Sequence, residues 1–194
     1  MAEHNLKILF VGNMNAGKTS LLHRLCRDEV PETTVATIGF EYSGLTYTYP
    51  SKETIKFSIW DAGGMERFRS IVGMYYRGIS MACIVVDNSD PDAESHVKYW
   101  IPESKRHTDA PLLLIVNKTD IERGEQYHPW LDISVEHDVC YVSGSAKEES
   151  QEVWMERLKP FLLAAGSSNA TASTPSIHLD KQKGREEPCM SCCA

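Results

Sequence analysis

Residues 12–19, Gly-Asn-Met-Asn-Ala-Gly-Lys-Thr, match the pattern G-x-x-x-x-G-K-[ST] and lie between a strand-like and a helix-like stretch. This context is typical of a loop that wraps around phosphate groups. Glycine lets the backbone approach the ligand, so that successive N–H groups and the N-terminus of the following helix point at the anion. The pattern therefore predicts a nucleoside triphosphate site. A glycine-containing turn with an incidental lysine is the alternative interpretation.

Two side chains of this loop have expected roles in charge neutralisation. Lys18 would neutralise phosphate charge, and the hydroxyl of Thr19 would bind a Mg²⁺ that bridges the β- and γ-phosphates. The residues expected to surround the phosphates are Asn13, Met14, Asn15, Ala16, Gly17, Lys18, Thr19 and Ser20.

Strand-like and helix-like stretches alternate along most of the chain. Continuous apolar runs, such as 81–86 and 112–116, are typical of strands buried on both faces of a parallel sheet. The alternating stretches 40–49 and 54–60 flank turn-forming residues and predict a β-hairpin. We expect strands at 6–11, 40–49, 54–60, 81–86, 112–116 and 139–142, and helices at 19–26, 93–107 and 148–165. Pro102 is expected to kink or split the second of these helices, and Pro160 to bend the third.

This order predicts an α/β fold of three layers, in which a mostly parallel six-stranded sheet carries one antiparallel edge hairpin. Ligands of such sheets bind beyond the carboxyl ends of the strands. The phosphate loop, Asp61, Asn117 and Ser145 each follow an expected strand. We therefore expect them to gather at one edge of the sheet.

Composition limits the classes of protein that the chain can represent. With 194 residues, 42% of them hydrophobic, it has room for one domain at 1–165 and a tail at 166–194, whose small and charged residues predict disorder. A formal net charge of −7 argues against nucleic acid as a partner. No apolar run approaches the ~20 residues that span a bilayer, and residues 1–5 lack the features of a secretory signal, so we expect a cytosolic protein.

The tetrapeptide at 117–120, Asn-Lys-Thr-Asp, indicates which base is bound. The carboxylate of Asp120 can accept hydrogen bonds from the N1–H and 2-amino groups of guanine, a donor pair that adenine lacks. A surface turn is the alternative interpretation, but the phosphate loop in the same chain favours guanine nucleotide. The residues expected around the base are Asn117, Lys118, Asp120, Ser145, Ala146 and Lys147, the last three through a backbone N–H toward the base oxygen.

Three further stretches, at 37–42, 60–68 and 75–78, read TIGFEY, WDAGGMERF and YYRG. With them, residues 5–165 resemble a small GTPase of the Ras superfamily, in particular its Rab branch. The resemblance implies the P-loop small GTPase fold and a GTP-binding domain at 1–165. It also implies GTP/GDP and Mg²⁺ as cofactors, and hydrolysis of GTP to GDP and phosphate.

The same resemblance assigns roles to single residues. It implies that Thr37 coordinates Mg²⁺ in the GTP state, that Asp61 holds a magnesium-bound water and that the N–H of Gly64 contacts the γ-phosphate. Residues 30–42 and 62–78 are then switch segments, ordered by the γ-phosphate and Mg²⁺. The expected catalytic residues are Lys18, Thr37, Gly64 and Met65.

Three positions depart from the family pattern. Met65 replaces the glutamine that orients the attacking water, and a thioether offers only a weak acceptor. Met14 replaces a small residue near the γ-phosphate, where its bulk would obstruct an arginine from an activating protein. Both predict slow hydrolysis, unless another group positions the water. Val30 replaces an aromatic ring that packs on guanine, which predicts ready nucleotide exchange.

The six cysteines form two groups. Cys26, Cys83 and Cys140 lie within apolar segments, where we expect them to be buried core residues. Near the C-terminus, Cys192 and Cys193 resemble the doubly geranylgeranylated cysteines of Rab proteins, and two lipid chains would give stable membrane anchoring. A zinc site is the competing interpretation, although C-x-x-C-C supplies too few well-spaced ligands.

These observations predict a Rab-like GTP switch in membrane or vesicle traffic, located in the cytosol and on the cytoplasmic face of an intracellular membrane. The expected partners are effectors of the GTP state, an exchange factor, an activating protein and a prenyl-binding escort protein. Trp60, Phe68 and Tyr75 are expected to pack in the core and to form part of the surface that partners bind. A hydrolysis-deficient, GTP-dependent scaffold is the alternative function. An ATP-using P-loop enzyme fits the loop but not the tetrapeptide at 117–120.

Overall fold

The computed structural model describes residues 4–32, 36–63, 73–121 and 129–167. The strands are β1 (His4–Val11), β2 (Phe40–Thr48), β3 (Thr54–Ala62), β4 (Met81–Asp87), β5 (Leu112–Asn117) and β6 (Cys140–Ser143). The helices are α1 (Lys18–Arg27), the 3-10 helix η2 (Gly73–Tyr76), α3 (Ala93–His107), α4 (Trp130–His137) and α5 (Gln151–Ser167).

The strands form one six-stranded sheet in the order β2-β3-β1-β4-β5-β6. Strands β2 and β3 pair antiparallel at one edge, and the other neighbouring strands pair in parallel. This topology confirms the predicted α/β fold with an edge hairpin. It also places the ends of β1, β3, β5 and β6, which precede the expected site residues, at one edge of the sheet.

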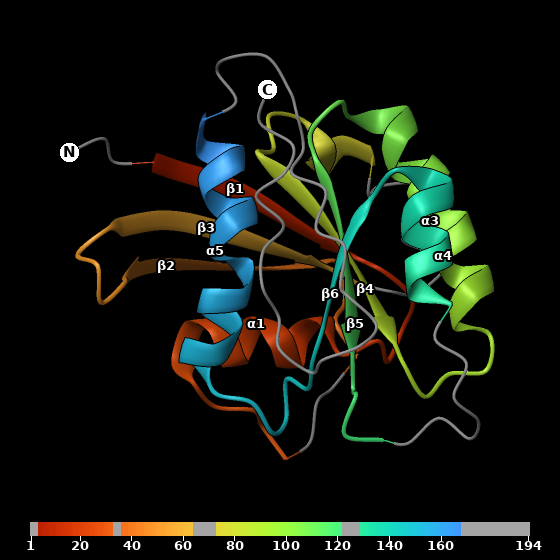
Figure 1. The fold of residues 1–194 in the computed structure, drawn as a ribbon, viewed down its shortest axis with the longest axis horizontal. Helices are drawn as coiled ribbons and strands as arrows, with labels where there is room; N and C mark the ends of the chain where they lie inside the picture. Colours follow the sequence, from red (N-terminus) through yellow and green to blue (C-terminus); the bar gives the residue numbers. More distant parts are fainter. Residues whose placement is uncertain (1–3, 33–35, 64–72, 122–128, 168–194) are drawn as a thin grey trace.

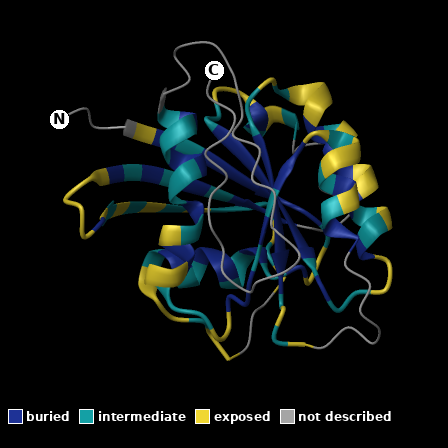
Figure 2. Cartoon of the chain, viewed as in Figure 1, coloured by how far each residue is buried: buried dark blue, intermediate teal, exposed yellow. Residues whose placement is uncertain are grey.

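Helices cover both faces of the sheet and complete three layers (Figure 1). Alternate residues of β1 enter different cores: Ile8 and Phe10 pack under α1 and α5, whereas Leu9 and Val11 pack under α3 and α4. Strands at the centre of the sheet are buried on both faces, and the helices expose their outer sides (Figure 2). Continuous apolar strands are the expected consequence of this double burial.

One helix differs from the sequence prediction, and two prolines lie inside continuous helices. The short helix α4 was not predicted, because only Trp130 and Ile133 are buried in it and one pair of apolar residues is a weak periodic signal. Pro102 does not split α3, so of the two alternatives only a kink stays a prediction, as does the bend expected at Pro160 within α5. Pro102 and Lys98 are both exposed, so water can satisfy the carbonyl that the proline leaves without a hydrogen bond.

The cysteines of the domain lie largely as expected. Cys83 and Cys140 are buried and Cys26 is half-buried at the edge of the core. Burial raises the pKa of the Cys83 thiol, because an apolar environment disfavours the thiolate. The expected disordered tail falls almost entirely at 168–194, which lies outside the described residues.

Candidate nucleotide site

The predicted phosphate loop joins the end of β1 to the start of α1. Gly12 and Gly17 both have positive φ, at 139° and 85°. A Cβ at Gly12 would collide with the carbonyl oxygen of Val85, and one at Gly17 would collide with the side-chain amide of Asn117. Both glycines are therefore required by backbone conformation and by close packing.

Lys18 begins α1 and is buried inside the loop. Its ammonium donates hydrogen bonds to the carbonyls of Gly12, at 3.0 Å, and Asn13, at 2.8 Å. Burial lowers the pKa of Lys18 to about 8, and the charge of Asp61 opposes this change. An anion beside this ammonium would favour its charged form, so the position suits a phosphate group.

Thr19, Thr37 and Asp61 bring oxygen atoms together beside the loop. The Thr19 hydroxyl donates to Oδ2 of Asp61 at 2.5 Å and lies 3.0 Å from the Thr37 hydroxyl, which lies 3.5 Å from the same Oδ2. Asp61 is fully buried, and burial raises its pKa to about 6. Its Oδ1 has no hydrogen-bond partner within the described part of the chain. Hydroxyl and carboxylate oxygens with a buried unpaired lone pair fit a hard cation such as Mg²⁺.

Asn117 joins the phosphate loop to the loop that follows β6. Its side-chain amide donates to the carbonyl of Ala16 at 3.1 Å, and its side-chain oxygen accepts the backbone N–H of Ala146 at 3.0 Å. Asn117 is 1% exposed, so these hydrogen bonds are shielded from water. The expected gathering of motifs at the carboxyl edge is thus built around this one carboxamide.

Asp120 has the same kind of unpaired oxygen as Asp61. Its Oδ1 is buried and has no hydrogen-bond partner among the residues that the structure describes. A buried carboxylate oxygen without a donor is costly, and a ligand that supplies donors removes this cost. The N1–H and 2-amino groups of guanine are donors of this kind.

Lys118 lies between these two residues in the left-handed conformation, with φ of 62°. Its ammonium forms an ion pair of 2.6 Å with Asp87 at the end of β4. Burial tends to raise the pKa of Asp87, but Lys118 and the N–H and hydroxyl of Ser89 hold that pKa below its ordinary value. Asp87 was not predicted as part of the site, since a single aspartate after a strand has no distinctive spacing.

The segment 145–147 is held by side chains from several elements. The backbone N–H of Ser145 donates to Glu149, that of Lys147 donates to the Ser145 hydroxyl, and that of Ala146 donates to Asn117. Each of these donors already has a protein partner. A contact from this segment to a base oxygen therefore stays a prediction, and for Ala146 it would be shared with Asn117.

Comparison with known proteins tests what this arrangement represents. Residues 7–120 match the family model described as "Ras of Complex, Roc, domain of DAPkinase". The chain is 32% identical to Ras-related protein RIC1 of Oryza sativa subsp. japonica over 184 residues, 92% of this chain and 88% of the relative. The chain belongs to the Ras-related small GTPases.

Further relatives place this small GTPase in the Rab-like branch. It is 40% identical to Ras-related protein Rab-1D of Dictyostelium discoideum over 123 residues, 61% of this chain and 60% of the relative. It is 32% identical to GTP-binding protein ypt1 of Schizosaccharomyces pombe over 152 residues, 76% of this chain and 74% of the relative. The resemblance drawn from the sequence motifs is confirmed.

In this GTPase, aromatic rings join the two expected switch segments. The rings of Phe40 and Tyr75 stack with centroids 3.4 Å apart, and Trp60 lies 5.6 Å from Tyr75. Ile38 and Met74 are exposed beside them, at 77% and 74%. Trp60 and Tyr75 pack against the core beneath, so their predicted place in the core is confirmed. Phe68 lies outside the described residues.

Several predicted site residues of this GTPase receive no structural account. Gly64 and Met65 lie outside the described residues, as do Cys192 and Cys193. Met14 is described and is 51% exposed. Among the described residues, no three His, Cys, Asp or Glu side chains gather into a possible metal site, and no helix has the length and apolar character to cross a membrane.

Sequence reasoning missed three contacts that support the site. Trp100 of α3 donates an indole hydrogen bond to Asn13, and Arg24 of α1 donates to the carbonyls of Ala146 and Lys147. Glu149, which accepts the Ser145 N–H, is held by Arg157 of α5. The contacts of Trp100 and Arg24 belong to no short motif, because each joins residues 87 or more positions apart. The contacts of Glu149 are closer in sequence but match no distinctive pattern.

Proposed function

We propose that this small GTPase is a Rab-like molecular switch in membrane traffic, which binds GTP and GDP with Mg²⁺ and hydrolyses GTP slowly. The observation that supports guanine most directly is the buried Oδ1 of Asp120, which has no hydrogen-bond partner in the described ranges of the chain and lies two residues beyond the ion-paired Lys118. A site with buried acceptors rejects ligands that lack the matching donors, so adenine nucleotides would bind poorly.

In the proposed complex, each part of the nucleotide meets a different group. Lys18 and the backbone N–H groups of the phosphate loop bind the phosphates. Thr19 and Thr37 would hold Mg²⁺ by their hydroxyls, and Asp61 would act through a water. When bound, Mg²⁺ neutralises charge on the phosphate oxygens. The N–H of Gly64 contacts the γ-phosphate.

The base would be held by residues that follow β5 and β6. Asp120 accepts the two guanine donors, and Asn117 and Lys118 keep the adjoining backbone in place. The segment 145–147 provides a backbone N–H to the base oxygen. Val30 is half-buried and offers less contact area than an aromatic ring, so nucleotide exchange should be ready.

Slow hydrolysis is the part of this proposal that rests on the two methionines. Met65 has no group that both donates to and accepts from a water, so the nucleophile would be poorly aligned. Met14 belongs to the phosphate loop and is 51% exposed, and its bulk would obstruct an arginine from an activating protein. If hydrolysis is absent altogether, the protein is a GTP-dependent scaffold, which is the second candidate function.

Membrane association completes the proposal. Double geranylgeranylation of Cys192 and Cys193 would anchor the protein on the cytoplasmic face of an intracellular membrane, with the escort protein shielding the lipids in the cytosol. Exchange factor, effectors and an activating protein would bind around the switch segments. Intact-mass measurement of protein from a prenylating cell should show two added lipid groups, and an unmodified C-terminus would remove the anchor from this account.

The nucleotide that co-purifies with the protein tests the central proposal. We expect GTP or GDP and no ATP, with guanine nucleotide released faster when Mg²⁺ is chelated. The γ-phosphate of bound GTP should then be lost over hours. ATP as the bound nucleotide would contradict the proposed specificity, and GTP that remains intact throughout would favour the scaffold.

A further inference from the structure

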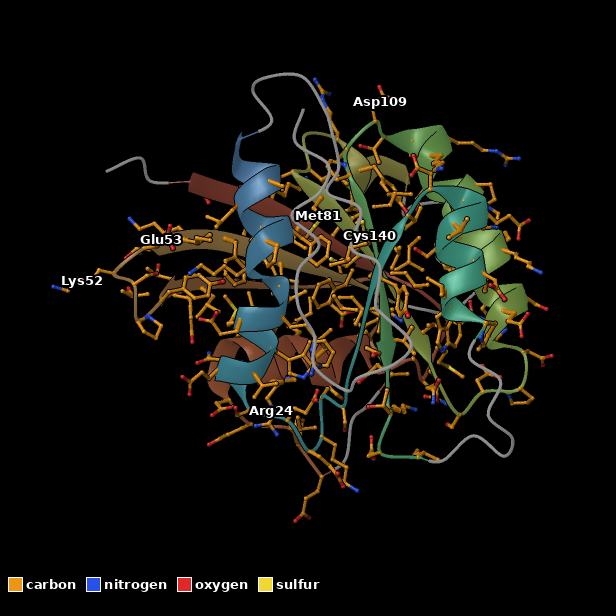
Figure 3. The ribbon with its side chains drawn as sticks, viewed as in Figure 1. Arg24, Lys52, Glu53, Met81, Asp109 and Cys140 are labelled. Atoms are coloured by element: carbon orange, nitrogen blue, oxygen red, sulfur yellow. The ribbon has the colours of Figure 1, made fainter. Side chains whose placement is uncertain are left out.

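Arg24 connects α1 to the segment that follows β6. Its guanidinium donates to the carbonyl of Ala146 at 2.9 Å and to that of Lys147 at 3.0 Å. The side chain is 13% exposed; its hydrogen bond to Ala146 is partly buried, and its hydrogen bond to Lys147 lies at the surface. Arg24 lies where α1 passes the turn that leads into α5 (Figure 3).

The same guanidinium is held in place from its other side. One nitrogen donates to the backbone carbonyl of Asp28, at 2.7 Å, and to its carboxylate, at 2.9 Å. That carboxylate also accepts the backbone N–H of Gln151 at 2.6 Å, whose side chain donates to the carbonyl of Leu25. The N–H of Gln151, and next Arg24, lower the pKa of Asp28, so it stays charged at neutral pH. The guanidinium of Arg24 is thus fixed in place, with N–H donors directed at the carbonyls of Ala146 and Lys147.

The backbone around Ala146 is held on both of its sides. Its N–H donates to Asn117, and its carbonyl accepts from Arg24. Rotation of this backbone out of the site would break both hydrogen bonds. Because Arg24 and the phosphate-binding Lys18 are on the same helix, the contact joins the phosphate end of the site to its base end.

We propose that Arg24 is a positioning residue for guanine, which holds the Ala146–Lys147 carbonyls so that the Ala146 N–H faces the 6-oxo group of the base. This inference rests on the proposed guanine-nucleotide function. It predicts that removal of the Arg24 guanidinium weakens only the interaction with the 6-oxo group of guanine. Contacts to the phosphates and to the 2-amino group should remain.

The test compares, between variant and wild type, the dissociation rates of three diphosphates: GDP, inosine diphosphate, which keeps the 6-oxo group and N1–H but lacks the 2-amino group, and 2-aminopurine riboside diphosphate, which lacks the 6-oxo group and the N1–H. R24Q removes the positive charge and the several N–H donors of the guanidinium. We expect GDP and inosine diphosphate to dissociate about tenfold faster, and the third ligand less than about threefold faster. R27Q, an exposed arginine of the same helix, is the matched control and should change no rate.

The outcomes separate this inference from the function on which it rests. Wild-type protein that retains no guanine nucleotide overturns both. Wild-type retention with unchanged rates in R24Q overturns the positioning role alone. The positioning role is also overturned if all three diphosphates dissociate from R24Q faster by the same factor and the melting temperature of R24Q is lower. Arg24 would then only support the fold. If R24Q does not fold, R24K must show the same ligand preference to a smaller degree, and equal losses in R24K overturn the inference.

Discussion

The indole N–H of Trp100 donates a 2.8 Å hydrogen bond to the side-chain oxygen of Asn13, and so joins α3 to the phosphate loop. Trp100 is 3% exposed, which fixes the donor within the core. The backbone carbonyl of Asn13 accepts the ammonium of Lys18. The residue that α3 holds is therefore one of the two whose carbonyls hold Lys18, the predicted phosphate-binding lysine.

Trp100→Phe should weaken nucleotide retention. The phenyl ring keeps most of the packing but loses the hydrogen bond, which is worth about 1 kcal/mol. We expect GDP to dissociate roughly three- to tenfold faster. Tyr76→Phe is the matched control, since it removes the 2.8 Å hydrogen bond to Ser104 of the same helix, away from the loop. Comparable acceleration in both variants would indicate a general effect of α3 stability.

Asp120→Asn should change the preferred base. The carboxamide has one acceptor and one donor where the carboxylate has two acceptors, so its donor would face the 2-amino group of guanine. We expect GDP affinity to fall about 100-fold. Xanthosine diphosphate, which carries an oxygen at position 2, should bind the variant better than the wild type. Competition between the two diphosphates measures this directly, and an unchanged ratio would argue against base contact by Asp120.

Met65→Gln should accelerate hydrolysis. The carboxamide can align the attacking water, and we expect single-turnover loss of the γ-phosphate to become about tenfold faster or more. Met74→Gln, at an exposed methionine outside the predicted phosphate site, should have no effect. A wild-type rate that already equals that of Met65→Gln would mean that another group positions the water.

The ion pair between Asp87 and Lys118 should make stability depend on acid pH. Because the folded-state pKa of Asp87 is depressed, its stabilising contribution is present above the unfolded pKa of about 3.9 and is lost as pH falls through the folded value. Thermal unfolding of wild type and Asp87→Asn between pH 7 and pH 2 should therefore give curves that converge on acidification. A constant difference across this range would contradict the role of the charge.

Most of the fold could be predicted from the sequence, because strand order follows from local patterns and connection rules. Continuous apolar runs marked β4 and β5, and alternation marked the hairpin. The loop at 12–19 and the tetrapeptide at 117–120 located the main side chains of the candidate nucleotide site. Each of these motifs is a short continuous stretch, so the order of its residues is enough to recognise it.

The supporting contacts could not be predicted in the same way. The pair Trp100–Asn13 is 87 residues apart and the pair Arg24–Ala146 is 122 apart. Such pairs depend on which face of a helix meets which loop, and helix packing angles decide this. The sequence pattern predicts that a tryptophan in an apolar position is part of the core, but it does not predict which acceptor its indole N–H will find.

The two hydrogen bonds of Asn117 to Ala16 and Ala146 have a consequence for the newly made chain. The phosphate loop is synthesised early, yet its partner carboxamide follows 101 residues later and the last strand later still. A ribosome-bound chain that ends before residue 146 lacks the bond that closes the base end of the site. Stable capture of guanine nucleotide should therefore begin only after β6 has joined the sheet, and would report that the phosphate and base ends of the site have come together.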